Sequence, residues 1–164
     1  MSPELVAQFT AFTDTLPCSR MVYPTSFLNK LKYIFWRLYT PYHPFWRDLL
    51  LALGILSHEG RQNFLLGRVA PGESIKSLVT FLISRGYGNH FIAWKDEGEV
   101  IGLRYVDNFT YQYHIRIFKD GEVRGHYEYT PECHPVWHFK EVRMEDRRAE
   151  FLSLLGDRIV PRAQ

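Results

Sequence analysis

Charged and proton-transferring side chains occupy alternate positions in two stretches between residues 104 and 128, and this spacing is the strongest chemical feature of the chain. Alternate residues of a β-strand point to the same face of a sheet, so a period of two gathers such side chains on one surface. Histidine titrates near neutral pH, and arginine offers phosphate a fork of donors. The predicted catalytic residues are His114, His126 and Glu128, and the predicted phosphate-binding residues are Arg104, Arg116 and Arg124.

This set of side chains suits metal-free cleavage of an RNA phosphodiester bond. That reaction needs a base for the 2′-hydroxyl, an acid for the leaving 5′-oxygen and cations on the phosphate. His114 and His126 can exchange the acid and base roles, Glu128 is an alternative base, and the arginines supply the cations. The hypothesis requires no cofactor and no metal, and RNA is the expected partner. The competing interpretation is a solvated sheet face whose arginines pair with Glu122, Glu128 or acids near the C-terminus.

The Lys-Asp-Gly turn at residues 119–121 sets the register of the hairpin that carries most of these residues. A three-residue loop with the glycine at positive φ pairs His114 with His126 and Arg116 with Arg124. The tyrosines and aliphatic residues then share one face and the candidate residues share the other. A two-residue loop would mix Ile117 with Arg124. Facing arginines destabilise a strand pair, so this register also predicts an anion nearby, from the protein or from a ligand.

A second hairpin is predicted around the Asp-Glu-Gly turn at residues 96–98, where the same loop would pair His90 with Arg104 and Phe91 with Leu103. An Asp-Asn turn at residues 107–108 joins the two hairpins. Turns at this spacing are typical of consecutive antiparallel strands. The sequence therefore predicts a four-stranded antiparallel meander over residues 89–130.

Helical patterns precede and follow this sheet. We predict helices at residues 27–39, 45–57, 75–85 and 144–155, with Thr25 or Ser26 capping the first and Ser74 the third. The second is apolar nearly all round, which favours a buried position. Residues 62–69 fit a strand or a helix, and we expect a loose tail. The predicted fold class is α+β, with N-terminal helices, a four-stranded antiparallel meander and a C-terminal helix. It divides into a helical region, residues 1–70, and a sheet domain, residues 71–164, or forms one continuous domain.

Composition narrows the functional classes. The chain has 164 residues, of which 46% are hydrophobic, so it can form a core, and its net charge of +2 alone does not argue for nucleic-acid binding. Two distant cysteines provide no disulfide framework, which favours a cytoplasmic location. The longest apolar run, residues 49–56, is too short to span a bilayer, so no membrane partner is expected.

Two further groups of residues have more than one interpretation. Cys133, His134 and His138 are of ligand type for zinc, but Pro135 disfavours the helix that would bring them together, so no metal site is predicted. Aromatic and basic residues at 23–47 favour core packing over a nucleic-acid or membrane surface. The alternatives to an enzyme are a non-catalytic module that binds RNA or protein, and a helical interaction protein in which residues 27–56 dock to a partner or to a second copy.

Residues 111–140, which read YQYHIRIFKDGEVRGHYEYTPECHPVWHFK, resemble TumE-like toxins of bacterial and archaeal toxin–antitoxin systems. More broadly, helices followed by a four-stranded antiparallel sheet are similar to the RelE and barnase-like ribonuclease architecture. The resemblance covers about the last half of the chain. It implies RNA cleavage on the sheet face and an antitoxin as protein partner. By motif position it implicates His114, and less directly His134 and His138.

Overall fold

The structure is a computed structural model, and it describes residues 15–55, 64–89, 95–135, 138 and 143–162. Its α-helices and 3₁₀ turns alternate with short strands in the first half, and a meander of longer strands follows. The elements are α2 (Phe27–Tyr39), η1 (Thr40–Tyr42), α3 (His43–Ala52), β1 (Leu65–Val69), α4 (Ile75–Ser84), β2 (Gly88–Asn89), β3 (Glu99–Val106), β4 (Tyr111–Phe118), β5 (Glu122–Tyr129), α6 (Arg148–Leu155), η3 (Gly156–Arg158) and β6 (Ile159–Pro161).

The predicted α+β class is confirmed, but the predicted count of four strands is wrong. The strands form one sheet of six in the order β2-β3-β4-β5-β1-β6, and every pairing is antiparallel. β1 lies within residues 62–69, for which a strand and a helix were both left open, and β6 was not predicted. Both strands are short and pair with partners far away in the sequence, so no turn motif marks them. The tail expected to be loose contains β6.

At Gly67 the backbones of β1 and β6 meet so closely that a Cβ atom would lie 2.2 Å from the carbonyl oxygen of Val160.

The register predicted for the central hairpin is confirmed, whereas that of the first hairpin is wrong. His114 faces His126 and Arg116 faces Arg124, and Gly121 has the predicted positive φ of 86°. Arg104 faces Gly88 rather than His90, which lies outside the described residues. Because the error is two positions and the side-chain period is also two, Arg104 stays on the predicted face.

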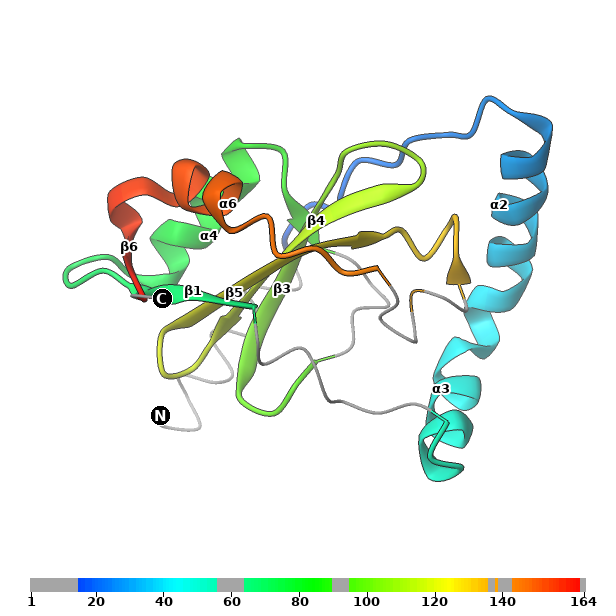
Figure 1. The fold of residues 1–164 in the computed structure, drawn as a ribbon, viewed down its shortest axis with the longest axis horizontal. Coiled ribbons are helices and arrows are strands. Elements are labelled where there is room, and N and C mark those ends of the chain that lie inside the picture. Colours follow the sequence, from blue (N-terminus) through cyan, green and yellow to red (C-terminus); the bar gives the residue numbers. More distant parts are fainter. Residues whose placement is uncertain (1–14, 56–63, 90–94, 136–137, 139–142, 163–164) are drawn as a thin grey trace.

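Two helices cover the apolar face of the sheet. α4 and α6 lie together on one side of the molecule (Figure 1), and both contribute buried side chains to the core. Ser74 caps α4, as predicted, by accepting a hydrogen bond from the backbone N–H of Ser77. The last helix begins at Arg148 rather than at 144, because Glu145 forms a β-bridge with Tyr127. The core consists of Leu66, Leu78, Val79, Leu82, Tyr87, Ile101, Leu103, Ile115, Ile117, Val123, Phe151, Leu155 and Ile159.

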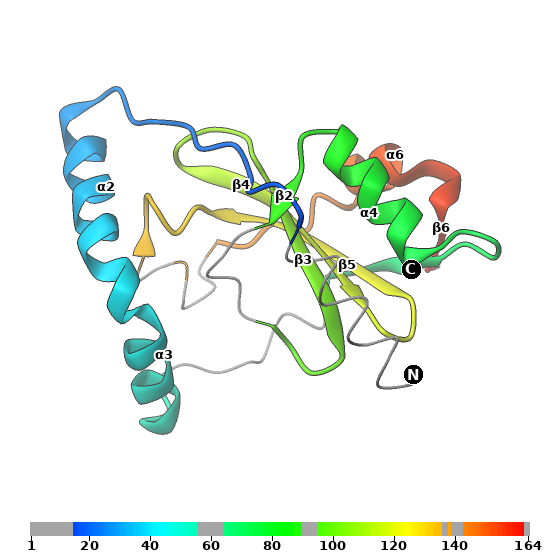
Figure 2. The same ribbon diagram turned by 180° about the vertical axis from the view of Figure 1, so that it is seen from behind.

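The elements α2, η1 and α3 form a helical arm, residues 27–52, at the end of the molecule opposite α4 and α6 (Figures 1 and 2). Ser26 caps α2, as predicted. The prediction that α3 is buried is wrong: within the arm only Trp36 and His43 are buried. The arm stands beside the sheet and therefore buries one narrow stripe instead of being enclosed. Within the described residues, none of the helices combines the length and the apolar character that crossing a membrane requires.

Candidate functional site

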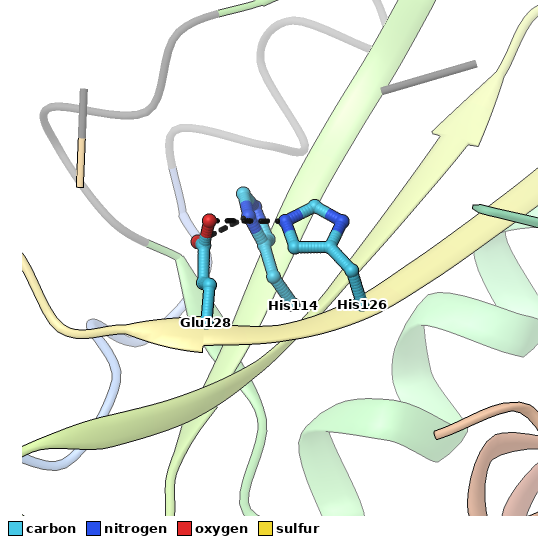
Figure 3. A group of neighbouring side chains, drawn as sticks. All are labelled: His114, His126 and Glu128. Atoms are coloured by element: carbon cyan, nitrogen blue, oxygen red, sulfur yellow. Dashed lines mark hydrogen bonds and ion pairs between the residues drawn. The ribbon is translucent and has the colours of Figure 1, made fainter. Parts of the chain in front are cut away.

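The polar face of the sheet brings the three predicted catalytic residues together. His114 on β4 lies directly opposite His126 on β5, and Glu128 follows two residues after His126 on the same face. Figure 3 shows the two imidazole rings and the carboxylate directed toward one another. Both strands are internal to the sheet, so hydrogen-bonded neighbours fix the backbone that positions these side chains.

Glu128 joins the two histidines. One carboxylate oxygen lies 3.1 Å from Nδ1 of His114, and the other lies 3.1 Å from Nε2 of His126. The side-chain amide of Gln112 donates a 2.8 Å hydrogen bond to the oxygen that His114 contacts. The exposed fractions are only 7% for His114, 1% for His126 and 4% for Glu128. The cluster is therefore an enclosed polar network and not an open surface patch.

Burial and the shared carboxylate act on the two ends of this network in opposite ways. Burial lowers the pKa of His114 to about 3, and this outweighs the hydrogen bond to Glu128, which acts to raise it. Burial alone would raise the pKa of Glu128, but electrostatic interactions with His138 and His126 and the hydrogen bonds from His114 and His126 hold it well below its usual value. At neutral pH Glu128 is therefore ionised, and His114 is a neutral imidazole that can accept a proton or bind a metal ion.

Arg104 is engaged by a carboxylate of the protein. Its guanidinium forms a two-pronged pair with Glu132, at 2.9 and 3.1 Å, and it also donates to Gln112 and to Ser19. Arg104 and Glu132 are both about 3% exposed. The guanidinium N–H groups that would bind a phosphate are therefore already donating to Glu132.

The facing arginines also have anionic partners from the chain itself. Arg116 contacts Asp96 at 2.9 Å and Glu99 at 2.8 Å. Arg124 contacts Glu122 at 2.7 Å, as the interpretation of a self-paired face predicted, and its guanidinium stacks on the ring of Phe118. The phosphate-binding role of the arginines therefore stays a prediction, and these contacts do not favour it.

Sequence reasoning missed the carboxylates at positions 96, 99 and 132. Asp96 was interpreted only as part of the hairpin turn, and neither Glu99 nor Glu132 was assigned a role. Their charge next to three unexplained arginines was the signal that could have identified them. Among the described residues, ion pairs join the three arginines of this face to four carboxylates, and Glu128 pairs with histidines.

The other group of possible zinc ligands does not converge. Cys133 contacts Thr110 and Lys32, and His134 packs on the ring of Tyr129. His138 instead approaches the central cluster: its Nδ1 donates to the backbone carbonyl of Tyr129 at 2.8 Å and lies 3.8 Å from the carboxylate of Glu128.

The helical arm forms a second candidate surface. Thirteen of the fifteen exposed large hydrophobic side chains in the described part of the chain lie between residues 23 and 55. Exposed apolar area on this scale marks an interaction site in a folded protein.

Comparison of the chain with protein-family models, with curated proteins and with solved structures found no significant match. The polar sheet face and the helical arm are therefore the two features that bear on function.

Proposed function

We propose that the protein binds a partner protein through the helical arm. The observation that carries this proposal is a continuous series of exposed apolar residues separated alternately by three and four positions. Leu38, in the middle of the series, is 70% exposed. The series, which we call the seam, consists of Leu28, Leu31, Phe35, Leu38, Tyr42, Phe45 and Leu49.

The spacing of the seam indicates what shape of partner it receives. Apolar residues at alternating intervals of three and four repeat every 3.5 residues on average, and this period keeps one stripe of a helix against a second helix. The seam runs along α2, crosses the 3₁₀ turn η1 at Tyr42 and continues along α3. Ile34 and Trp46, beside it, widen its apolar surface. An α-helix laid along the arm would cover it.

The charge around the seam favours an acidic helix from another protein. Residues 15–55 contain five basic side chains and a single acid, Asp48, whereas the whole chain has a net charge of only +2. Two copies of the arm would bring like charges together, and glutamate or aspartate beside an apolar stripe would be attracted to it. The basic residues are Arg20, Lys30, Lys32, Arg37 and Arg47.

Two synthetic helical peptides test this proposal by calorimetry. Both carry leucine at the heptad a and d positions, and one is flanked by glutamate, the other by lysine. We expect the acidic peptide to bind, more weakly as salt rises, and Leu31→Gln with Leu38→Gln to weaken binding at least tenfold. Ile55→Gln is the matched control, because it removes an exposed aliphatic side chain beyond α3.

Several outcomes would contradict the proposal. Equal binding of the two peptides would show that charge does not select the partner. Undiminished binding by the variant with Leu31→Gln and Leu38→Gln would show that the seam is not the binding surface. Light scattering that finds a dimer dependent on Leu31 and Leu38 would replace the acidic partner with a second copy. Docking to phosphatidylglycerol vesicles with no peptide binding would make the arm a membrane surface.

Endoribonuclease activity is the second candidate, and one observation favours it: the predicted acid and base, His114 and His126, share Glu128. The burial of all three and the paired arginines make this candidate weaker than partner binding. The test is end-labelled RNA with the protein, with and without EDTA, beside His114→Ala. EDTA-resistant cleavage that the variant loses would support the toxin-like ribonuclease, and the absence of cleavage by folded protein would contradict it.

A further inference from the structure

We propose that His114, His126 and Glu128 form a binding site for one divalent transition-metal ion, with zinc the best match. The proposal goes beyond partner binding and does not depend on it. Two imidazole nitrogens and one carboxylate oxygen converge here, and the three potential ligand atoms lie within 4.8 Å of one another. Figure 3 shows these side chains meeting from two neighbouring strands.

The distances suit a metal of this size. Zinc binds imidazole nitrogen and carboxylate oxygen at about 2.0–2.2 Å, which separates tetrahedral ligands by about 3.3 Å. Each carboxylate oxygen of Glu128 already lies 3.1 Å from one imidazole nitrogen. Three protein ligands leave one tetrahedral position, which a water molecule would take.

The charge of the network provides an independent argument. In the described part of the chain, the ion pairs of Glu128 are all with histidines. Among the described residues, the arginines of this face contact carboxylates other than Glu128. A buried ionised carboxylate is costly without a compensating cation. A bound divalent ion would place a cation beside the buried carboxylate of Glu128.

The donor atoms and the hydrogen bond that orients Glu128 indicate which metal the site would bind. Nitrogen donors favour zinc and its first-row neighbours over magnesium and calcium, which prefer oxygen ligands. Gln112 donates to the carboxylate of Glu128 and holds its orientation, as outer partners do around metal ligands. The ligands lie on internal strands and are almost fully buried, so the backbone holds them in place, although three protein ligands with an open fourth position is the ligand count of catalytic zinc sites.

Metal binding and metal-free cleavage make opposite predictions. The ion would occupy imidazole nitrogens that acid–base catalysis by His114 and His126 would need. Added zinc would therefore inhibit a ribonuclease that uses these histidines as acid and base.

The test measures zinc directly in the untagged full-length chain. After equilibration with zinc and removal of free ion, elemental analysis should find one zinc per chain in the wild type. Competition with a chromogenic chelator should show affinity at least about 100-fold lower in His126→Asn and in Glu128→Gln, the upper end of losses seen when outer partners of a metal site are changed. His134→Gln, a histidine outside the cluster, is the matched control and should bind like the wild type.

Two results would overturn the proposal: the absence of stoichiometric zinc in folded wild-type protein, and unchanged affinity in Glu128→Gln. If the ligand variants do not fold, X-ray absorption of the zinc-loaded wild type decides. Two imidazoles and one carboxylate around zinc support the site, and any other count of imidazoles contradicts it.

Discussion

The buried pair of Arg104 and Glu132 gives the sharpest prediction about stability. Glu132→Gln keeps the size of the side chain but leaves the guanidinium buried without its counter-charge. Both residues are about 3% exposed, and two hydrogen bonds join them. Breaking such a pair from one side costs about 3–5 kcal/mol. For a chain of this length that corresponds to a fall in Tm of about 6–20 °C.

The assay is urea denaturation followed by tryptophan fluorescence, with thermal melts beside it. Arg104→Met should cost a similar amount, and the double variant Arg104→Met with Glu132→Leu should lose less than the sum of the two, with a coupling of about 1–3 kcal/mol. Glu145→Gln, which removes an exposed ion pair with Arg147, should leave the denaturation midpoint unchanged within error. The reasoning would be refuted if Glu132→Gln were as stable as the wild type, or if the losses of stability in the two single variants simply added in the double variant. Arg104 would then be available to bind an anion from outside the chain.

Three further predictions concern the strands, a helix cap and a buried histidine. Gly67→Ala should destabilise the protein by at least about 1–3 kcal/mol, because its Cβ would meet the carbonyl of Val160; faster hydrogen exchange in β6 would locate the damage. Ser74→Ala should cost about 1 kcal/mol in urea denaturation by removing the cap of α4, while Ser77→Ala, which keeps the cap, should cost less. Burial, followed by the charge of His138, lowers the pKa of His43 to about 4. The unfolded chain therefore binds this proton first, so stability should fall as pH drops from about 6.5 toward 4, and His43→Leu should reduce that fall in pH-dependent melts.

Local signals were sufficient for the hairpin and for two helix caps. The glycine at 121 and the alternation around it define the register of β4 and β5, and Ser26 and Ser74 each precede an apolar helical pattern. These features depend on residues close together in the sequence, so the sequence alone carries enough information.

Division of the chain at residue 70 stays a prediction, although β1, which precedes that point, belongs to the sheet.

Features that depend on distant partners were not predictable in this way. β1 pairs with β5 and β6, and Glu132 pairs with an arginine 28 residues earlier, without a local motif for either contact. The second helix of the arm was predicted to be buried because a broad apolar stripe is equally consistent with a core helix and with a surface that receives another helix.

The place of β1 in the sheet has a consequence for how the chain folds. The meander β3-β4-β5 joins neighbours in sequence, whereas β1 sits between β5 and β6 and pairs with residues 159–161. Contacts between such distant segments form slowly, because a long loop must close first. During synthesis on a ribosome, β1 emerges early and keeps an open edge until Ile159 to Pro161 follow. A nascent chain halted before that point would expose the edge at Gly67 to Val69, where another strand could pair in place of β6.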